Sequence, residues 1–194
     1  MKKKTLAMLI ALVLVLALGV GGTLAWLKAQ TTEVVNTFAP STIGLVLTET
    51  DTNLDKDGNP NTNAYKMVPG ATNAKDPKIT VAKGSEPCWV FVKITEENNV
   101  INADKKFLEY NIDATENWTE LGDGVYYKAV DALNEDVEIN VLANKIVTTN
   151  SEVTKAEMAS LTDYPKIKIT AYAIQQEGFP VEKIAKAWEQ AQAL

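Results

Sequence analysis

The sequence of 194 residues has no histidine, no arginine and only one cysteine, Cys88. The lack of histidine removes the imidazole general base, the Ser-His-Asp and Cys-His nucleophile systems and the HExxH zinc site. The phosphate-binding loops GxxxxGK and GxGxxG are also missing, so nothing supports nucleotide binding. Carboxylate pairs could act on a glycoside, but acids spread this evenly are typical of a solvated surface. We therefore expect no enzymatic activity.

A single cysteine cannot form an intramolecular disulfide, so the core alone must hold the fold together. Cys88 lies between Pro87 and Trp89 in an apolar run. This setting predicts a small buried side chain in a strand, and it argues against a reactive thiol.

Lysines occupy positions 2 to 4, and no charged side chain follows from Leu6 to Val20. This is the profile of a secretory signal peptide. Thr23 and Ala25 place small side chains where a signal peptidase requires them, which predicts cleavage between Ala25 and Trp26. We expect residues 1–25 to be a cleaved signal peptide and the mature protein to be secreted.

A retained membrane anchor is the alternative interpretation. The apolar stretch could be extended to Leu27, which approaches the roughly 20 residues that a spanning helix needs. Three glycines at positions 19, 21 and 22 weaken a permanent helix, however, and a fitting cleavage site follows them. Cleavage is the preferred interpretation.

The predicted mature chain is strongly acidic. It keeps 16 of the 19 lysines and all 25 acids, a net charge of −9. Such a surface repels nucleic acid and anionic lipid, so we expect no nucleic-acid partner. Its length is enough for one domain with a real core. We divide it into a flexible segment, residues 26–38, and a single domain, residues 39–194.

Alternating apolar residues and β-branched or aromatic runs predict a chain made mainly of strands. The expected strands are Phe38–Thr48, Ile79–Val81, Cys88–Ile94, Lys106–Ile112, Val125–Val130, Val137–Thr148 and Lys166–Ile174. The last one alternates cleanly, which predicts one buried face and one solvated face. About seven strands separated by turns favour an antiparallel β-sandwich.

Two short helices are expected at the periphery of the sandwich. Ser151 or Thr154 could cap a helix that ends near Leu161. The C-terminal stretch Val181–Leu194 is amphipathic, with an apolar stripe of Ile184, Ala185, Trp188 and Ala191.

Tryptophan and tyrosine could also indicate carbohydrate binding, since exposed rings stack on sugars. Trp89 lies within an apolar strand and Trp188 on the apolar stripe of a helix, where core packing is the default. Trp118, in Asn117-Trp118-Thr119, is the one in a setting that allows exposure.

A loop rich in Asp and Asn suggests calcium as the one cofactor. Oxygen-bearing side chains occur at every second position and Gly58 permits a sharp turn, as in the first half of a DxDxDG calcium loop. The candidate ligands are Asn53, Asp55, Asp57, Asn59 and Asn61. The twelfth position is Ala64 where a bidentate Glu is expected, so a plain Asx-rich loop without metal remains the alternative. Calcium here would be structural.

The N-terminal region resembles TasA/camelysin-type exported proteins. The resemblance rests on Lys2–Lys4, on Gly22-Thr23-Leu24-Ala25-Trp26 and on Asn36-Thr37-Phe38-Ala39, which leads into a strand. It covers residues 1–48 specifically and is thin beyond them. It implies cleavage at Ala25 and Trp26 by a SipW-type signal peptidase, a jelly-roll-like sandwich and assembly into extracellular-matrix or cell-surface fibres. The metallopeptidase activity of the camelysin type is not expected, because the chain has no histidine ligand and no zinc motif.

A physical route to fibres exists independently of the resemblance. An open sandwich has edge strands with unpaired backbone groups, and a flexible N-terminus can pair with a neighbour's edge to give a head-to-tail polymer. Residues 26–38 suit this role as a donor strand, with Val34 and Val35 to pair and Phe38 to anchor. The expected partners are thus other copies of the chain and other matrix proteins. The alternative function is a monomeric, adhesin-like binding module at the cell surface, stabilised by calcium.

Overall fold

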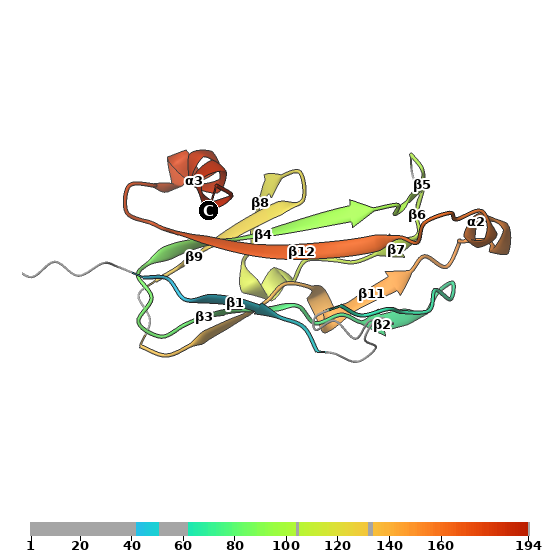
Figure 1. Ribbon diagram of the computed structural model, residues 1–194, viewed down its shortest axis with the longest axis horizontal. Helices are drawn as coiled ribbons and strands as arrows, with labels where there is room; N and C mark the ends of the chain where they lie inside the picture. Colours follow the sequence, from blue (N-terminus) through green and yellow to red (C-terminus); the bar gives the residue numbers. More distant parts are fainter. Residues whose placement is uncertain (1–41, 51–61, 104, 132–133, 194) are drawn as a thin grey trace, which may run out of the picture. The chain divides into compact units, whose positions relative to one another are not determined.

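Two antiparallel layers of strands stack face to face in the computed structural model (Figure 1). The structure describes residues 42–50, 62–103, 105–131 and 134–193. All of them belong to one compact unit, Pro40–Leu194. The mainly β, sandwich-like fold with short helices confirms the fold class expected from the sequence.

The first layer contains two short sheets that continue each other. Its strands are β1 (Leu45–Thr48), β2 (Thr72–Ala74), β3 (Lys78–Val81), β7 (Leu108–Glu109), β10 (Val137–Asn140) and β11 (Ile146–Thr149). The pairing orders are β1-β3-β10 and β2-β11-β7, so β2 with β3, and β10 with β11, act as two long strands that are each interrupted. The layer therefore reads β1, β2/β3, β10/β11, β7.

The second layer is a continuous four-stranded sheet in the order β12-β4-β9-β8. Its strands are β4 (Cys88–Glu97), β8 (Thr119–Gly122), β9 (Val125–Val130) and β12 (Lys166–Gln175). A small hairpin of β5 (Val100–Asn102) and β6 (Lys105–Lys106) stands beside one end. In the first layer, β10/β11 lies between β2/β3 and β7. In the second layer, β4 lies between β12 and β9. These nested pairings give the sandwich its jelly-roll-like character.

The core lies between the layers. Alternate residues of β4, from Cys88 to Ile94, meet Ile79 and Val81 of β3 and Ile139 of β10 there, and all are at most 4% exposed. Burial raises the pKa of the Cys88 thiol to about 11, which confirms a buried cysteine in a strand.

The outer face of the second layer carries the C-terminal helix. Short 3₁₀ helix η4 (Val181–Lys183) leads into α3 (Ile184–Ala191), which packs on Phe91 and the other outward side chains of β4, β9 and β12. Trp89 donates its Nε1–H to Phe179 O at 2.7 Å and so fixes the connection before the helix. β4 is therefore apolar on both faces, because one faces the core and the other faces α3.

Two predictions about these elements are wrong in detail. On α3, Ala185 is exposed and Ala187 is fully buried, because the contact stripe follows Ile184, Ala187 and Ala191. On β12, the outer face is solvated only in part, because Tyr172 lies under α3.

The expected strand Val137–Thr148 is interrupted by 3₁₀ helix η3 (Ala143–Lys145). Five residues separate β10 from β11, whereas only three separate the strands they pair with, β3 and β2. Two residues of the longer connection therefore cannot pair across the sheet. Asn144 and Lys145 take positive φ values of 54° and 56° there. A pattern of β-branched residues does not reveal such an insertion.

The expected strand Lys106–Ile112 is also divided. Lys106 pairs with β5, Leu108 and Glu109 pair with β11, and Ile112 forms a separate bridge with Leu142. Buried Asn99 holds this junction, because its side chain accepts from Leu108 N and donates to Leu108 O. β2, β5 and β8 were not predicted, since they are short and lack apolar alternation.

Glu96 lies near the C-terminal end of β4. Burial acts to raise its pKa, but hydrogen bonds from Lys106, Asn99 and Tyr110 outweigh burial and hold the pKa below its ordinary value. The same contact raises the pKa of the Tyr110 hydroxyl, together with burial. This end of the sandwich is thus closed by a satisfied polar cluster.

The first predicted helix is confirmed as α2 (Lys155–Ala159), with Thr154 as its N-cap. Thr154 and Glu157 form a reciprocal capping box, and Lys105 binds the Glu157 carboxylate at 3.0 Å. The hydrogen bonds from Thr154 and Lys105 lower the pKa of Glu157 to about 2. The helix ends two residues earlier than expected.

Burial of Cys88 predicts a thiol that reacts only after unfolding. With a pKa of about 11, roughly one thiol in a thousand is ionised at pH 8. Even this ionised form is buried in the sheet and out of reach of a reagent in solution. Native protein treated with iodoacetamide at pH 8 should keep its mass for hours, while protein in guanidinium should gain one label quickly. Rapid labelling of the native chain would contradict this packing.

Candidate functional site

The residues singled out in the sequence lie outside the described part of the chain. Residues 1–41 include the cleavage pair Ala25 and Trp26 and the polymerisation residues Val34, Val35 and Phe38. Residues 51–61 include the candidate calcium ligands Asn53, Asp55, Asp57, Asn59 and Asn61. Those predictions stay predictions.

The first candidate feature is the outer edge of β12. Gln176 N donates to Pro87 O at 2.9 Å, in the same register that pairs Ile174 with Trp89. Because hydrogen-bonded pairs alternate in an antiparallel ladder, the even-numbered residues of β12 bond to β4. The odd-numbered residues turn their N–H and C=O groups outward; they are Ile167, Ile169, Ala171, Ala173 and Gln175. Among the described residues no strand pairs with this side.

β1 presents a similar but shorter edge on the same side of the sandwich. Ala82 N donates to Gly44 O at 2.8 Å, so the backbone groups of Leu45 and Leu47 point away from β3. β1 and β12 run beside each other at the boundary between the layers (Figure 1). The side chains of Leu45, Leu47, Ile167 and Ile169 face the core and are only half-buried. We use the term open edge for two features together. They are the outward N–H and C=O groups of β12 and the adjacent seam of half-buried side chains, Leu45, Leu47, Ile167 and Ile169.

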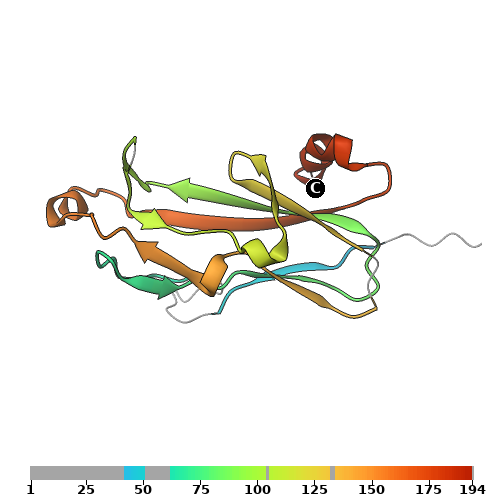
Figure 2. The ribbon, with the colours of Figure 1, turned by 180° about the vertical axis from the view of Figure 1, so that it is seen from behind.

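The opposite side is closed in a different way (Figure 2). Glu116, from 3₁₀ helix η2 (Ala114–Glu116), accepts from the outward N–H of Asn140 at 2.9 Å. Trp118 donates its Nε1–H to the outward C=O of Asn140 at 3.0 Å. Trp118 is therefore half-buried against the core, which corrects the expectation that it could be an exposed sugar-binding ring.

Lys128 completes this closure from β9. Its Nζ lies 3.1 Å from the Glu116 carboxylate and 5.7 Å from the centre of the Trp118 ring. On the same side, edge strand β8 is short and its register shifts between Glu120 and Gly122. Bulges and side-chain caps are the usual means of blocking strand addition, and here they protect only one side of the sandwich.

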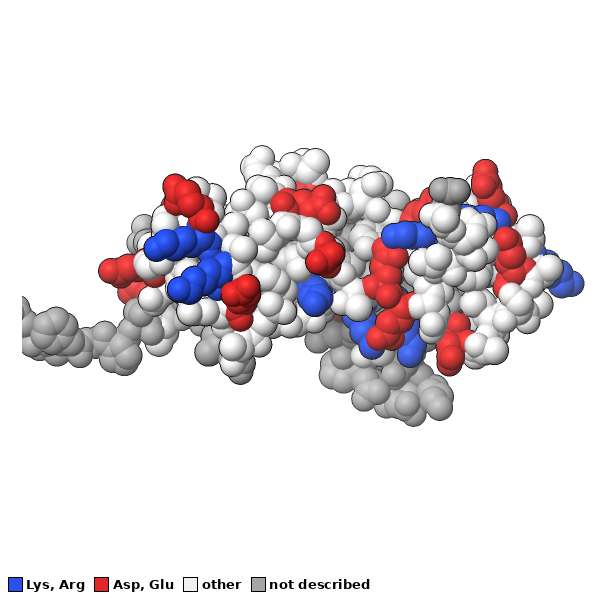
Figure 3. Space-filling view, turned by 90° about the horizontal axis from the view of Figure 1, so that it is seen from above, with Lys and Arg blue, Asp and Glu red and all other residues white. Residues whose placement is uncertain are grey.

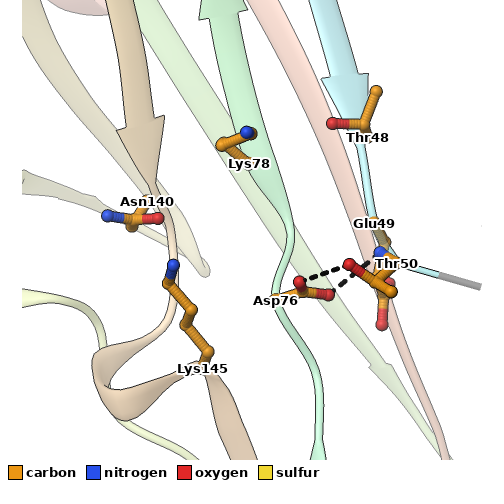
Figure 4. A pocket seen from close by; sticks show the side chains of 7 residues that line it. All are labelled: Thr48, Glu49, Thr50, Asp76, Lys78, Asn140 and Lys145. Carbon is orange, nitrogen blue, oxygen red and sulfur yellow. Dashed lines mark hydrogen bonds between the residues drawn. The ribbon is translucent and has the colours of Figure 1, made fainter. Parts of the chain in front are cut away.

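The second candidate feature is a polar hollow of about 300 Å³ at the base of the 51–61 segment (Figure 4). Its lining residues come from the ends of β1, β3, β10 and η3. They are Thr48, Glu49, Thr50, Asp76, Lys78, Asn140 and Lys145. Thr50 is the last described residue before the Asp- and Asn-rich loop, so this loop begins at the hollow.

Asp76 ties the start of that loop to the sheet. Its carboxylate accepts from Thr50 N at 3.0 Å and from Thr50 Oγ1 at 2.7 Å. Beside it, Lys75 binds Glu49 at 2.8 Å, with side chains that are 15% and 8% exposed. Burial acts to raise the pKa of Asp76, but the hydrogen bonds from Thr50 outweigh it and lower the pKa below 3.8. The carboxylate is thus ionised at neutral pH.

The hollow has mixed charge. Two carboxylates, Glu49 and Asp76, and two ammonium groups, Lys78 and Lys145, line it. Glu49 is paired with Lys75, and Lys78 with Glu138. In residues 42–50, 62–103, 105–131 and 134–193, no group of three or more carboxylate or cysteine side chains could hold a metal ion. A calcium site at this position would need its oxygens from the loop itself.

Charges elsewhere are mixed as well. On the face seen in Figure 3, lysines and acids occur in small interspersed groups. The pair Lys168–Glu97 links β12 to β4. Such pairs are solvated and contribute little to stability.

Sequence reasoning missed the residues of the polar hollow and those of the Glu116 closure, except for Trp118, to which it gave a different role. Thr50 and Asp76 are 26 positions apart, and Glu116 and Asn140 are 24 apart, so no local pattern joins them. The outward edge of β12 was within reach, because a long alternating strand near the end of the chain is a natural edge strand.

Comparisons with protein-family models, with curated proteins and with solved structures found no match. No helix of the described residues is long and apolar enough to cross a membrane.

The Thr50–Asp76 contact predicts an acid-sensitive tether for the loop. Because the pKa of Asp76 is lower in the folded state, its contribution is complete above the unfolded value of about 4 and is lost as pH falls through the folded value. Asp76→Asn should lower the free energy of unfolding by about 1 kcal/mol at pH 7 and by less at pH 2. Denaturant titrations at both pH values measure this, with exposed Asp163→Asn as the control. An equal loss at both pH values would contradict the assignment.

Proposed function

We propose that this protein is a secreted structural subunit of an extracellular-matrix or cell-surface fibre, assembled by strand addition between copies. The observation that carries the proposal is the open edge of β12, a strand of ten residues without a bulge. An edge of this length, with no strand paired to it in the described part of the chain, is a template for another strand. The exposed side chains of Lys166 and Lys168 project from its outer face. The opposite side has its exposed backbone groups capped by Glu116 and Trp118, so addition is favoured at one side only.

The open edge offers two kinds of binding free energy. A strand added beside β12 gains hydrogen bonds from the outward groups of Ile167, Ile169, Ala171 and Ala173, at about 1 kcal/mol each. Its alternate side chains would cover the seam where Ile167, Ile169 and the leucines of β1 are only half-buried. Burial of one large apolar side chain there contributes about 2 kcal/mol more. Both contributions are needed, because association costs several kcal/mol in lost translational and rotational freedom.

The proposed donor is residues 26–38 of another copy, released by cleavage between Ala25 and Trp26. Val34 and Val35 suit a strand, and Phe38 supplies the large apolar anchor. Donor and acceptor are different surfaces of one chain, so each added copy presents a new open edge and the assembly does not close. The chain has no histidine, and the proposed role requires no catalysis.

Removal of the donor should abolish polymers and leave the sandwich intact. Mature protein without residues 26–37 keeps every described strand, so its circular dichroism should match that of the full mature chain. Negative-stain microscopy should show filaments for the full mature chain and none for the deletion. Persistent filaments in the deleted protein would show that another surface drives assembly.

Proline at an outward position of β12 should block the acceptor. Ala171→Pro removes an N–H that faces away from β4, so the monomer should stay folded while filaments are lost. The matched control is Thr170→Pro, whose N–H faces β4, and it should lower the unfolding free energy by about 1 kcal/mol or more. Ala173→Pro repeats the test two residues further along. Normal filaments from both outward variants would exclude β12 as the acceptor.

A monomeric surface-binding module is the second candidate function. It is supported by the polar hollow at the base of the Asp- and Asn-rich loop, which combines hydroxyl, amide, carboxylate and ammonium groups. A secreted protein that begins at Trp26 and stays monomeric at high concentration would favour this candidate.

A further inference from the structure

Three side chains from different elements meet at the closed side of the sandwich. Glu116 of η2 places one carboxylate oxygen, Oε2, 3.1 Å from Lys128 Nζ on β9. The other oxygen, Oε1, is 3.3 Å from the side-chain amide nitrogen of Asn140 on β10 and 2.9 Å from its backbone nitrogen. A primary amine and a primary amide are thus held on the two oxygens of a single carboxylate.

We propose that Lys128 and Asn140 form an intramolecular amide bond, with Glu116 as the proton carrier. The bond would join β9 of the second layer to β10 of the first, and so link the two layers covalently. The proposal is independent of fibre assembly, because it concerns one chain.

The chemistry balances without any other reactant. Glu116 Oε2 takes a proton from the Lys128 ammonium group, and the neutral amine attacks the side-chain carbonyl carbon of Asn140. A C–N bond forms to Nζ while the bond from that carbon to Nδ2 breaks. Glu116 then returns that proton, through the Oε1 that faces Nδ2, to the leaving nitrogen, which departs as ammonia. Glu116 Oε2 also takes the second proton of the attacking nitrogen, which leaves an amide N–H, and passes it to the ammonia, which is released as ammonium. No electron is transferred and no cofactor is needed.

The surroundings favour this exchange. The side chains of Lys128 and Glu116 are each only 18% exposed, so the contact between them is largely shielded from solvent. Trp118 is fixed by its hydrogen bond to Asn140 O and covers Lys128 from one side. The amine and the amide are therefore both held by one carboxylate, beside a tryptophan ring that is itself fixed.

The amide of Asn140 is also oriented for the reaction. Figure 4 shows its nitrogen turned away from the polar hollow and its oxygen turned toward it. Lys78 and Lys145 line the hollow on the oxygen's side. Lys78 is paired with Glu138 at 2.7 Å, so the Lys145 ammonium is the one that would stabilise the negative oxygen that develops when the amine attacks.

A second contact of the same residue types serves as an internal comparison. Glu96 binds Lys106 and the amide of Asn99. The Lys106 side chain is 51% exposed, and both ends of the Asn99 amide are held by the backbone of Leu108. Lys106 therefore keeps its hydration and Asn99 cannot turn its carbonyl carbon toward the amine. The cross-link is expected at Lys128 and Asn140 only.

Intact mass spectrometry of the purified mature protein tests the proposal. The expected result is a mass about 17 Da below that of the same chain without a cross-link, equal to one ammonia. Tandem spectra of a protease digest should place the loss on a branched peptide that contains Lys128 and Asn140. Lys128→Arg keeps the charge but cannot form the bond, and Glu116→Gln keeps the shape but cannot carry the proton. Both should restore the full mass and lower the melting temperature.

The full sequence mass in the wild-type protein would overturn the proposal, since an ion pair alone does not change mass. A loss mapped to Lys106 and Asn99, or to any other pair, would overturn it as well. The wild-type measurement decides the matter even if a variant fails to fold. Filament formation is scored separately by microscopy, so failure of the cross-link and failure of the proposed function are distinguishable.

Discussion

The burial of β4 on both faces is the constraint on which the described structure depends. One face, through residues such as Val90 and Val92, packs into the sandwich core, while Phe91 on the other face lies under α3. Because β4 pairs with β12 along its full length and with β9 along most of it, it also sets the register of the second layer. From Cys88 to Val92 a polar group on either face would be cut off from solvent, which explains the apolar run there.

The two sides of the sandwich have opposite properties as a consequence of strand order. β12 is the last strand in the sequence and lies at the edge of its sheet. In the described part of the chain, no strand pairs with its odd-numbered residues. On the other side, Glu116 and Trp118 satisfy the outward groups of Asn140. In the described part of the chain, one side therefore has outward backbone groups that no strand pairs with, while on the other side the outward groups of Asn140 are satisfied. This asymmetry is what a head-to-tail polymer requires, since two equivalent edges would also allow branching.

Polar side chains in this fold work mainly by holding irregular segments. Asp76 ties Thr50 at the start of the Asp- and Asn-rich loop, and Asn99 secures the junction beside β5 and β6. Each such group makes several hydrogen bonds, because a half-buried carboxylate or amide is stable only when its partners are present. The Glu116 contact differs, since an amine and an amide share one carboxylate there.

The sequence by itself determined the class of the fold. Alternation over Lys166–Ile174 and the apolar run at Cys88–Ile94 specify strands, and the stripe near the C-terminus specifies a helix, because these periods are local properties of the chain. Strand order, the break between β10 and β11 and the meeting of Glu116, Lys128 and Asn140 were decided only by tertiary structure. Those features depend on which distant segments pack together, and no short stretch of sequence determines the free energy of that packing.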